Sequence, residues 1–361
     1  MSGAGYTVSG GPQGLGGCVS ALSRHLEVSE LTPRGDGVVA LALERGDTDW
    51  EALYKELAGA GCVAIARREG GAVRVLIARR EAKPRLDIAL ILGAAVLVTL
   101  YISGVFYSNG APPGSGGLAW SPWAYLAGLL VPLMIHELGH YVAMRRLGVP
   151  SSVPIPLPAP PYPWFLGTFG SVILMRWPPP TATSLALIGI AGPIAGYIAA
   201  LPVAAWGLSH SALIPPSQAA GGQAAPLVPL SLILLGHIFA PRGEGLIVLS
   251  PAAFAGYIMF FVTFLNLMPI GQLDGGHVVR AALGEKGHII VSNLFIVALI
   301  AAGLYYPQLG GFALIAILLY MLSRGRHPGP AMPEERLRAS GQAAAILYAA
   351  LLVLNMPIPQ G

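Results

Sequence analysis

Long apolar stretches separated by short polar segments dominate the chain after residue 86. A helix that crosses a membrane needs about 20 apolar residues, which makes seven stretches candidate spans. Residues 310–323 are short, so six spans are the alternative to seven. Residues 226–240 are interrupted by Pro229 and followed by charged residues, and we expect an interfacial helix there. The candidate spans are residues 87–107, 121–144, 184–208, 248–268, 288–306, 310–323 and 341–357.

The first part of the chain has a different pattern. Residues 37–45 predict one strand, and residues 62–80 predict a hairpin that turns at a Gly-Gly pair. Residues 47–61 predict a helix, with Asp47 or Thr48 as its N-cap. Together these elements predict a small β-α-β-β unit.

These patterns divide the chain into three parts. Residues 1–25 are Gly-rich, lack the apolar segment of a signal peptide and are expected to form a disordered tail. Residues 26–85 are expected to form a soluble domain with a regulatory or packing role and no catalytic site of its own. Residues 86–361 are expected to form a helical, polytopic transmembrane domain.

Composition agrees with a membrane protein. The chain is 54% hydrophobic and 11% charged, whereas a soluble domain is about 25% charged. Its mean hydropathy is +0.65 and its net charge is +4. The sequence shows no basic stripe with interleaved aromatic residues, so nucleic acid is not an expected partner. Cys18 and Cys62 lie far apart without His or Cys neighbours, and we expect neither a disulfide framework nor a Cys-based zinc site.

The basic residues predict the orientation. The loops 108–120 and 209–225 contain no Lys or Arg, and only Arg242 falls on the same side as these loops. Short loops rich in Lys and Arg face the cytoplasm. We therefore expect a multi-pass protein of the cell membrane with a cytoplasmic N-terminal domain. The basic clusters are Arg79, Arg80, Lys83 and Arg85; Arg145 and Arg146; Arg280 and Lys286; and Arg324, Arg326, Arg336 and Arg338.

The second candidate span contains the sequence HELGH. His136 and His140 are four residues apart, so a helix places both imidazoles on one face, where they can reach one zinc ion. Glu137 is adjacent and can take a proton from water that the metal activates. The alternative is a polar cavity or a proton relay. Ionisable residues within a membrane are functional by default, which favours a site of either kind.

A catalytic zinc usually has three protein ligands. The 248–268 span runs into NLMPIGQLDGG, where Pro269 breaks the helix and several glycines permit irregular backbone. Such backbone within a membrane must face protein or a water-filled cavity. Asp274 is the carboxylate of this stretch, which makes it the candidate third ligand.

The two motifs together resemble the site-2 protease family of intramembrane zinc metalloproteases. The fixed residues of the family's N-x-x-P-x-x-x-L-D-G pattern are all present in residues 266–275. The resemblance implies that His136, His140 and Asp274 bind one Zn²⁺ per chain and that Glu137 is the general base. Asn266 is implied as a polar group near the substrate carbonyl, with a helix–helix hydrogen bond as the alternative.

The resemblance covers roughly residues 85–357 and includes two further segments. Residues 164–176 look like the family's β-hairpin that dips into the membrane, and residues 189–197 look like a close-packed span start. Residues 167–170 are expected to offer a strand edge to a substrate. The Pro-rich loop 150–163 is expected to help shape the substrate's approach. No loop between the spans is long enough for a PDZ domain.

The implied activity is an intramembrane endopeptidase that uses metal-activated water to cleave transmembrane segments of other membrane proteins. Its expected partners are such substrates and the lipid bilayer. Three alternatives belong to other classes: a membrane-anchored protease for soluble chains, a transporter or metal carrier, and an inactive homologue. The oligomeric state stays open.

The remaining histidines carry weaker signals. His277 is expected either beside the metal ligands or at the cytoplasmic interface, with the second position preferred. His237 is expected on a solvated helix face. No role is assigned to the histidines expected at boundaries or in loops, which are His25, His210, His288 and His327.

Overall fold

The computed structural model describes most of the chain. The described residues are 15–35, 37–46, 48–79, 86–162, 165–173, 175, 177–215, 227–323, 325, 327–333 and 335–360. Residues 1–14 of the predicted tail and several of the basic residues used for orientation lie outside them.

The N-terminal domain is a four-stranded antiparallel sheet with two helices. The strand order is β1-β2-β4-β3, so β1 and β3 are the edges. The predicted strand and hairpin are confirmed, and Gly70 and Gly71 make the turn with φ of +57° and +85°. The prediction missed β1. The elements are α1 (Gly16–His25), β1 (Leu26–Arg34), β2 (Gly37–Glu44), α2 (Trp50–Gly59), β3 (Cys62–Glu69) and β4 (Ala72–Arg79).

Two expectations about the start of the chain are wrong. Helix α1 occupies residues expected to be disordered, because Cys18, Ala21 and Leu22 form a buried stripe at helical spacing that the glycines around it conceal. Cys18 of α1 and Cys62 of β3 also form a disulfide, with their Cα atoms 6.2 Å apart. Their separation of 44 residues hid this proximity, which arises only when α1 packs on the sheet.

The N-cap of helix α2 is Asp49, one residue after Thr48 and two after Asp47. The carboxylate of Asp49 accepts hydrogen bonds from the backbone N–H groups of Glu51 and Ala52. These bonds satisfy two of the orphan donors at the start of the helix. Thr48 therefore does not cap the helix, and Asp47 lies outside the described residues.

Each predicted span is helical. Among the described residues, four helices are long and apolar enough to cross a membrane: α3, α4, α5 and α8. Helices α6, α7, α9 and α10 are apolar but shorter. The helices are α3 (Leu86–Ser108), α4 (Pro122–Arg146), α5 (Ala182–Ser209), α6 (Leu230–Phe239), α7 (Pro251–Leu267), α8 (Asp274–Tyr305), α9 (Gly310–Leu322) and α10 (Ala339–Leu354), with 3₁₀ turns η1 (Leu118–Trp120) and η3 (Pro307–Leu309).

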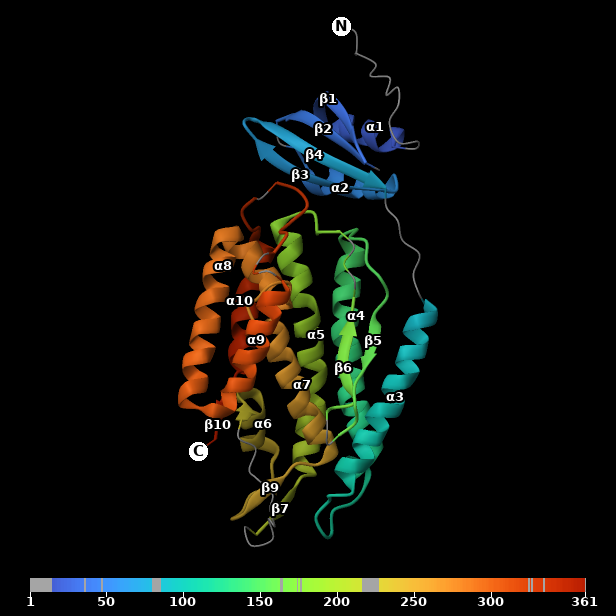
Figure 1. The fold of residues 1–361 in the computed structure, drawn as a ribbon. Coiled ribbons are helices and arrows are strands. Elements are labelled where there is room, and N and C mark those ends of the chain that lie inside the picture. The colour runs from blue at the N-terminus through green and yellow to red at the C-terminus, as the bar shows by residue number, and fades with distance from the viewer. Residues whose placement is uncertain are drawn as a thin grey trace.

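The helices run alongside one another as a bundle, and the N-terminal domain covers one end (Figure 1). Tyr125 and Leu129 of α4 pack with Phe260 of α7 in the centre of the bundle. Helix α8 is kinked at Gly284, which has a φ of +70°. Short strand pairs join loops at the other end: β7 (Ala212–Ile214) with β9 (Leu246–Val248), and β8 (Leu227–Pro229) with β10 (Pro357–Pro359).

The predicted hairpin has a different partner strand. Strand β6 (Thr168–Val172) pairs antiparallel with β5 (Ile155–Pro158), not with a strand inside residues 164–176. β5 lies in the Pro-rich loop. A segment with prolines can form this strand because proline is tolerated in an edge strand. The Thr99 hydroxyl of α3 donates to the Gly167 carbonyl at 2.6 Å, which fastens this two-stranded sheet to the bundle.

Candidate metal centre

Helix α4 presents the HELGH sequence inside the bundle. Ser121 caps the helix by accepting from the N–H of Ala124, and Pro122 occupies its first turn, where a missing N–H costs nothing. His136, Glu137 and His140 are all buried. A buried polar side chain is costly unless it has a partner, so partners for these groups are required.

The break between α7 and α8 positions the Asp274 carboxylate. Helix α7 ends before Pro269, and the Ser292 hydroxyl donates to the Pro269 carbonyl, which fixes the turn. Gly271 has a φ of +53°, a conformation that favours glycine. Asp274 is the first residue of α8. A carboxylate is favoured there by the positive end of the helix dipole.

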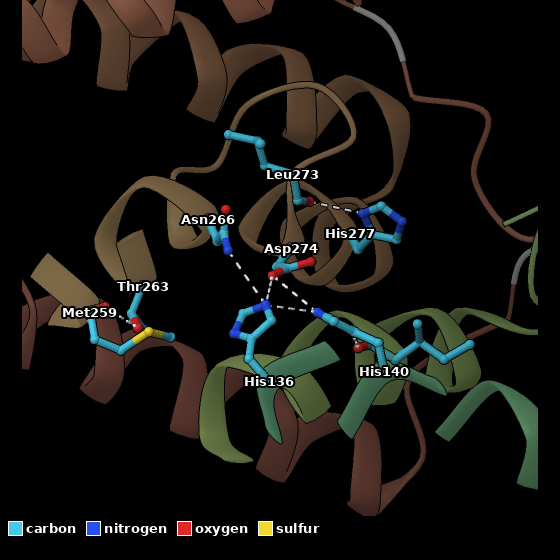
Figure 2. Close-up of polar contacts among 9 residues, drawn as sticks. His136, His140, Met259, Thr263, Asn266, Leu273, Asp274 and His277 are labelled. Carbon is cyan, nitrogen blue, oxygen red and sulfur yellow. Dashed lines mark hydrogen bonds and ion pairs between the residues drawn. The ribbon is translucent and has the colours of Figure 1, made fainter. Parts of the chain in front are cut away.

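Three donor atoms meet between α4 and α8 (Figure 2). The Asp274 Oδ2 lies 3.3 Å from the His136 Nε2 and 3.2 Å from the His140 Nε2. The two Nε2 atoms are 3.2 Å apart. Donors that each lie about 2.0–2.1 Å from a tetrahedral zinc are separated by roughly 3.4 Å. The three side chains therefore fit zinc without rearrangement.

One imidazole is oriented by a backbone carbonyl. The His140 Nδ1 donates to the carbonyl oxygen of Ile188 in α5 at 2.9 Å. This bond fixes the tautomer and leaves the lone pair of Nε2 for a metal. A backbone carbonyl carries no signature in the sequence, so Ile188 was not predicted.

Close packing of α5 on α4 confirms the expectation for residues 189–197. A Cβ added at Gly192 would lie 2.1 Å from the His140 Nε2, and one at Gly196 would lie 2.8 Å from the His136 Cβ. The two glycines form a G-x-x-x-G pattern, which brings membrane helices close together. That pattern was the available signal that these positions border the three gathered donors.

Two further predicted residues lie beside the donors. The Asn266 Nδ2 of α7 is 3.4 Å from the His136 Nε2, so its amide faces the same small space (Figure 2). Glu137 follows His136 directly but is not one of the three gathered donors. Its carboxylate therefore remains available for a role other than ligation.

A second group of histidines was misjudged. His288 and His327 were expected at a boundary or in a loop, but both are buried, as is His277. The ring of His327 lies 4.8 Å from that of His277 and 5.6 Å from that of His288. The His277 Nδ1 donates to the Leu273 carbonyl at 2.8 Å. His288 in α8 and His327 in the loop after α9 are buried by tertiary packing, which the local sequence does not reveal.

Comparison with known proteins agrees with this geometry. The chain is 28% identical over 249 residues to "Probable zinc metalloprotease EGY1, chloroplastic" from Oryza sativa subsp. japonica, a match to 66% of this chain and 40% of the relative. It is 30% identical over 171 residues to the protein of the same name from Arabidopsis thaliana, covering 46% of this chain and 30% of that protein.

These alignments span less than half the length of the relatives. No solved structure matches the chain. Residues 124–305, half of the chain, match Peptidase family M50. Because the matched region contains all three gathered donors, and half of the chain lies within it, the chain belongs to peptidase family M50, the family of the site-2 proteases.

Proposed function

We propose that this protein is an intramembrane zinc endopeptidase that cleaves peptide bonds within transmembrane segments of other membrane proteins. The observation that carries the proposal is the gathering of the His136, His140 and Asp274 donors inside apolar helices. A zinc ion bound there acts as a Lewis acid toward water and toward the scissile carbonyl.

Glu137 is the proposed general base and acid. It is buried and directly follows His136 on α4. From there its carboxylate takes a proton from the attacking water and passes it to the leaving nitrogen. Asn266 donates from Nδ2 to the substrate oxygen as that oxygen gains charge, which stabilises the transition state.

The substrate approaches as an extended strand in this proposal. A helical segment hides its carbonyls in hydrogen bonds and must unwind before hydrolysis. Strand β6 pairs with β5 on one side in the described structure, and its Phe169 and Val172 are exposed. An unwound substrate segment pairs with the other edge of β6, where main-chain hydrogen bonds hold many sequences equally well.

The proposed topology has seven spans: α3, α4, α5, α7, α8, α9 and α10, with the β5–β6 pair re-entrant. The ends of α4 and α8 that carry Arg145, Arg146, Arg280 and Lys286 lie toward the N-terminal domain (Figure 1). Positive charge at that end supports a protein of the cell membrane whose N-terminal domain lies on the cytoplasmic side. The names of the relatives place those proteins in the chloroplast, which makes a plastid membrane the alternative.

The deciding experiment is Glu137→Gln in proteoliposomes that contain a substrate with one transmembrane helix. The amide accepts no proton, so we expect hydrolysis to fall by about 10²–10⁴-fold, the usual contribution of a general base. Zinc content should stay at one ion per chain, because Glu137 is not a ligand. Cleavage close to the wild-type rate would remove Glu137 from the mechanism.

A further inference from the structure

The N-terminal domain and the membrane domain share one buried core. Residues from α1, α2 and the sheet pack with Met144 at the end of α4 and Ile188 in α5. Ala331 and Met332 of the loop between α9 and α10 complete the same cluster. Apolar burial of this kind holds domains in a fixed arrangement.

A ladder of backbone hydrogen bonds crosses the interface. At the edge of the sheet, the N–H of Ala66 in β3 donates to the Ala331 carbonyl at 2.8 Å. The N–H of Ala331 in turn donates to the Pro179 carbonyl at 2.7 Å, and that of Met332 donates to the Pro180 carbonyl at 2.9 Å. The ladder ends one residue before Thr181, the N-cap of α5.

Helix α2 holds the same end of α5 through side chains. The Tyr54 hydroxyl donates to the Pro178 carbonyl at 3.1 Å. The Thr181 hydroxyl donates to the Glu51 carboxylate at 3.2 Å, and Arg338 pairs with that carboxylate at 3.5 Å. The start of α5 is therefore fixed by the N-terminal domain from two directions.

Ile188 connects this interface to the metal ligands. It lies two turns after Thr181, and its side chain is buried in the shared core. Its carbonyl oxygen is the acceptor for the His140 Nδ1. The other ligand imidazole has no such anchor, because the His136 Nδ1 has no hydrogen-bond partner among the described residues.

We propose that the docked N-terminal domain sets the position of His140, with Ile188 as the positioning residue through which it acts. The inference rests on the proposed function, since it takes His140 as a zinc ligand. Packing on the Ile188 side chain fixes the α5 backbone, and that backbone orients the imidazole. The domain thereby controls how tightly zinc is held.

The sharpest test compares two isoleucines of α5. Ile188 and Ile190 are equally buried, at 3% exposure each, but Ile190 packs in a separate cluster with α8 and α10. Truncation to alanine costs both sites similar packing energy. In the full-length protein in detergent, we expect Ile188→Ala to release zinc to a chromophoric chelator about 10-fold faster, as loss of a ligand's partner does. Ile190→Ala should release zinc at the wild-type rate.

Two readouts separate positioning from general loosening. The visible spectrum of the Co²⁺-substituted protein reports ligand geometry, and it should change in Ile188→Ala and be restored in Ile188→Val. On the domain side, the double variant Glu51→Ala/Tyr54→Phe should raise the zinc release rate in the same direction. Its matched control, Glu69→Ala/Arg74→Ala, breaks an exposed ion pair between β3 and β4 of the same domain.

The outcomes discriminate the two proposals. Equal zinc release and equal Co²⁺ spectra for Ile188→Ala and Ile190→Ala would overturn the positioning role while leaving the metal centre intact. A domain-side variant that releases zinc no faster than its control would overturn the role of docking. Wild-type protein that binds no zinc would instead remove the proposed function itself.

Discussion

Two histidine clusters lie toward the same end of the molecule and differ in the charge beside them. The rings of His136 and His140 are 4.9 Å apart, and the rings around His327 are 4.8 and 5.6 Å apart. Ring spacing therefore does not distinguish the clusters. The first has the Asp274 carboxylate against both imidazoles, whereas the second has the Arg280 guanidinium beside it.

This difference teaches what makes a histidine cluster a metal site. A carboxylate offsets the charge of a divalent ion, and a guanidinium repels it. Among the described residues, the three donors of the first cluster are the group close enough to share one ion. In the second cluster the three rings pack against one another, and the His327 Nδ1 accepts from the Gly329 N–H at 2.9 Å.

The largest expected effect is loss of the metal. Asp274→Asn removes the charge that the first cluster depends on, and we expect zinc content to fall from one ion per chain to nearly none. The double variant His288→Gln/His327→Asn should keep its zinc, because the second cluster supplies no ligand. Metal analysis of both purified proteins checks this. Retention of zinc by Asp274→Asn would assign the third ligand elsewhere.

Glycines beside each cluster give the next comparison. In Gly192→Ala the new Cβ would meet the His140 imidazole at 2.1 Å, so the ligand must move. We expect zinc affinity to drop by more than about 100-fold, beyond the usual cost of losing a ligand's partner. Competition with a chelator measures this affinity.

Gly329→Ala tests the second cluster in the same way. Gly329 has a φ of +74°, and a new Cβ would lie 2.6 Å from the Arg280 Nη2. The left-handed conformation alone costs alanine about 1–2 kcal/mol of stability. We expect a lower unfolding temperature with unchanged zinc affinity, and weakened zinc binding would show that the clusters are coupled.

The last expected effect is a pH dependence of stability from the second cluster. Burial, followed by the nearby His277 and His288, lowers the pKa of His327 from 6.5 to about 2. The unfolded chain takes up this proton below its pKa of 6.5 while the folded chain does not. Stability from this group is therefore complete above that pH and decreases as the pH falls, by about 1.4 kcal/mol per pH unit.

His327→Asn keeps an acceptor for the Gly329 N–H and cannot titrate in this range. Its unfolding temperature should fall less than that of the wild type between about pH 7 and about pH 5. Parallel curves for the two proteins in a thermal-shift assay would contradict the neutral state of the buried ring.

The predictions from sequence succeeded where the signal is local. The helices and the β3–β4 hairpin follow from apolar runs and turn glycines. The structure also brings together His136, His140 and Asp274, which the HELGH and LDG sequences single out. The predictions failed where two distant segments meet. The Cys18–Cys62 disulfide joins segments 44 residues apart that no local pattern relates. The partner of β6 was missed for another reason, because β5 lies in the Pro-rich loop just before it.

The same limit applies inside the metal centre. His140 is held by the backbone carbonyl of Ile188. Every residue has such a carbonyl, so only its position in the folded chain makes this one a partner of His140. His288 and His327 looked like boundary residues because their burial is produced by packing between the two halves of α8 and the loop after α9. The sequence identifies the side chains that can carry chemistry, but the backbone groups that orient them are found only in the folded structure.

The ladder at the edge of β3 has a consequence for biosynthesis. Arg67 donates to the Ala331 carbonyl across a separation of 264 residues. At a synthesis rate of about 5–20 residues per second, roughly 13–50 s pass between synthesis of the four strands and synthesis of the segment that covers β3. An uncovered edge strand invites pairing with other chains. During that interval the charged run of Arg67, Arg68 and Glu69 protects β3, and Arg67 afterwards binds the segment that takes over this protection.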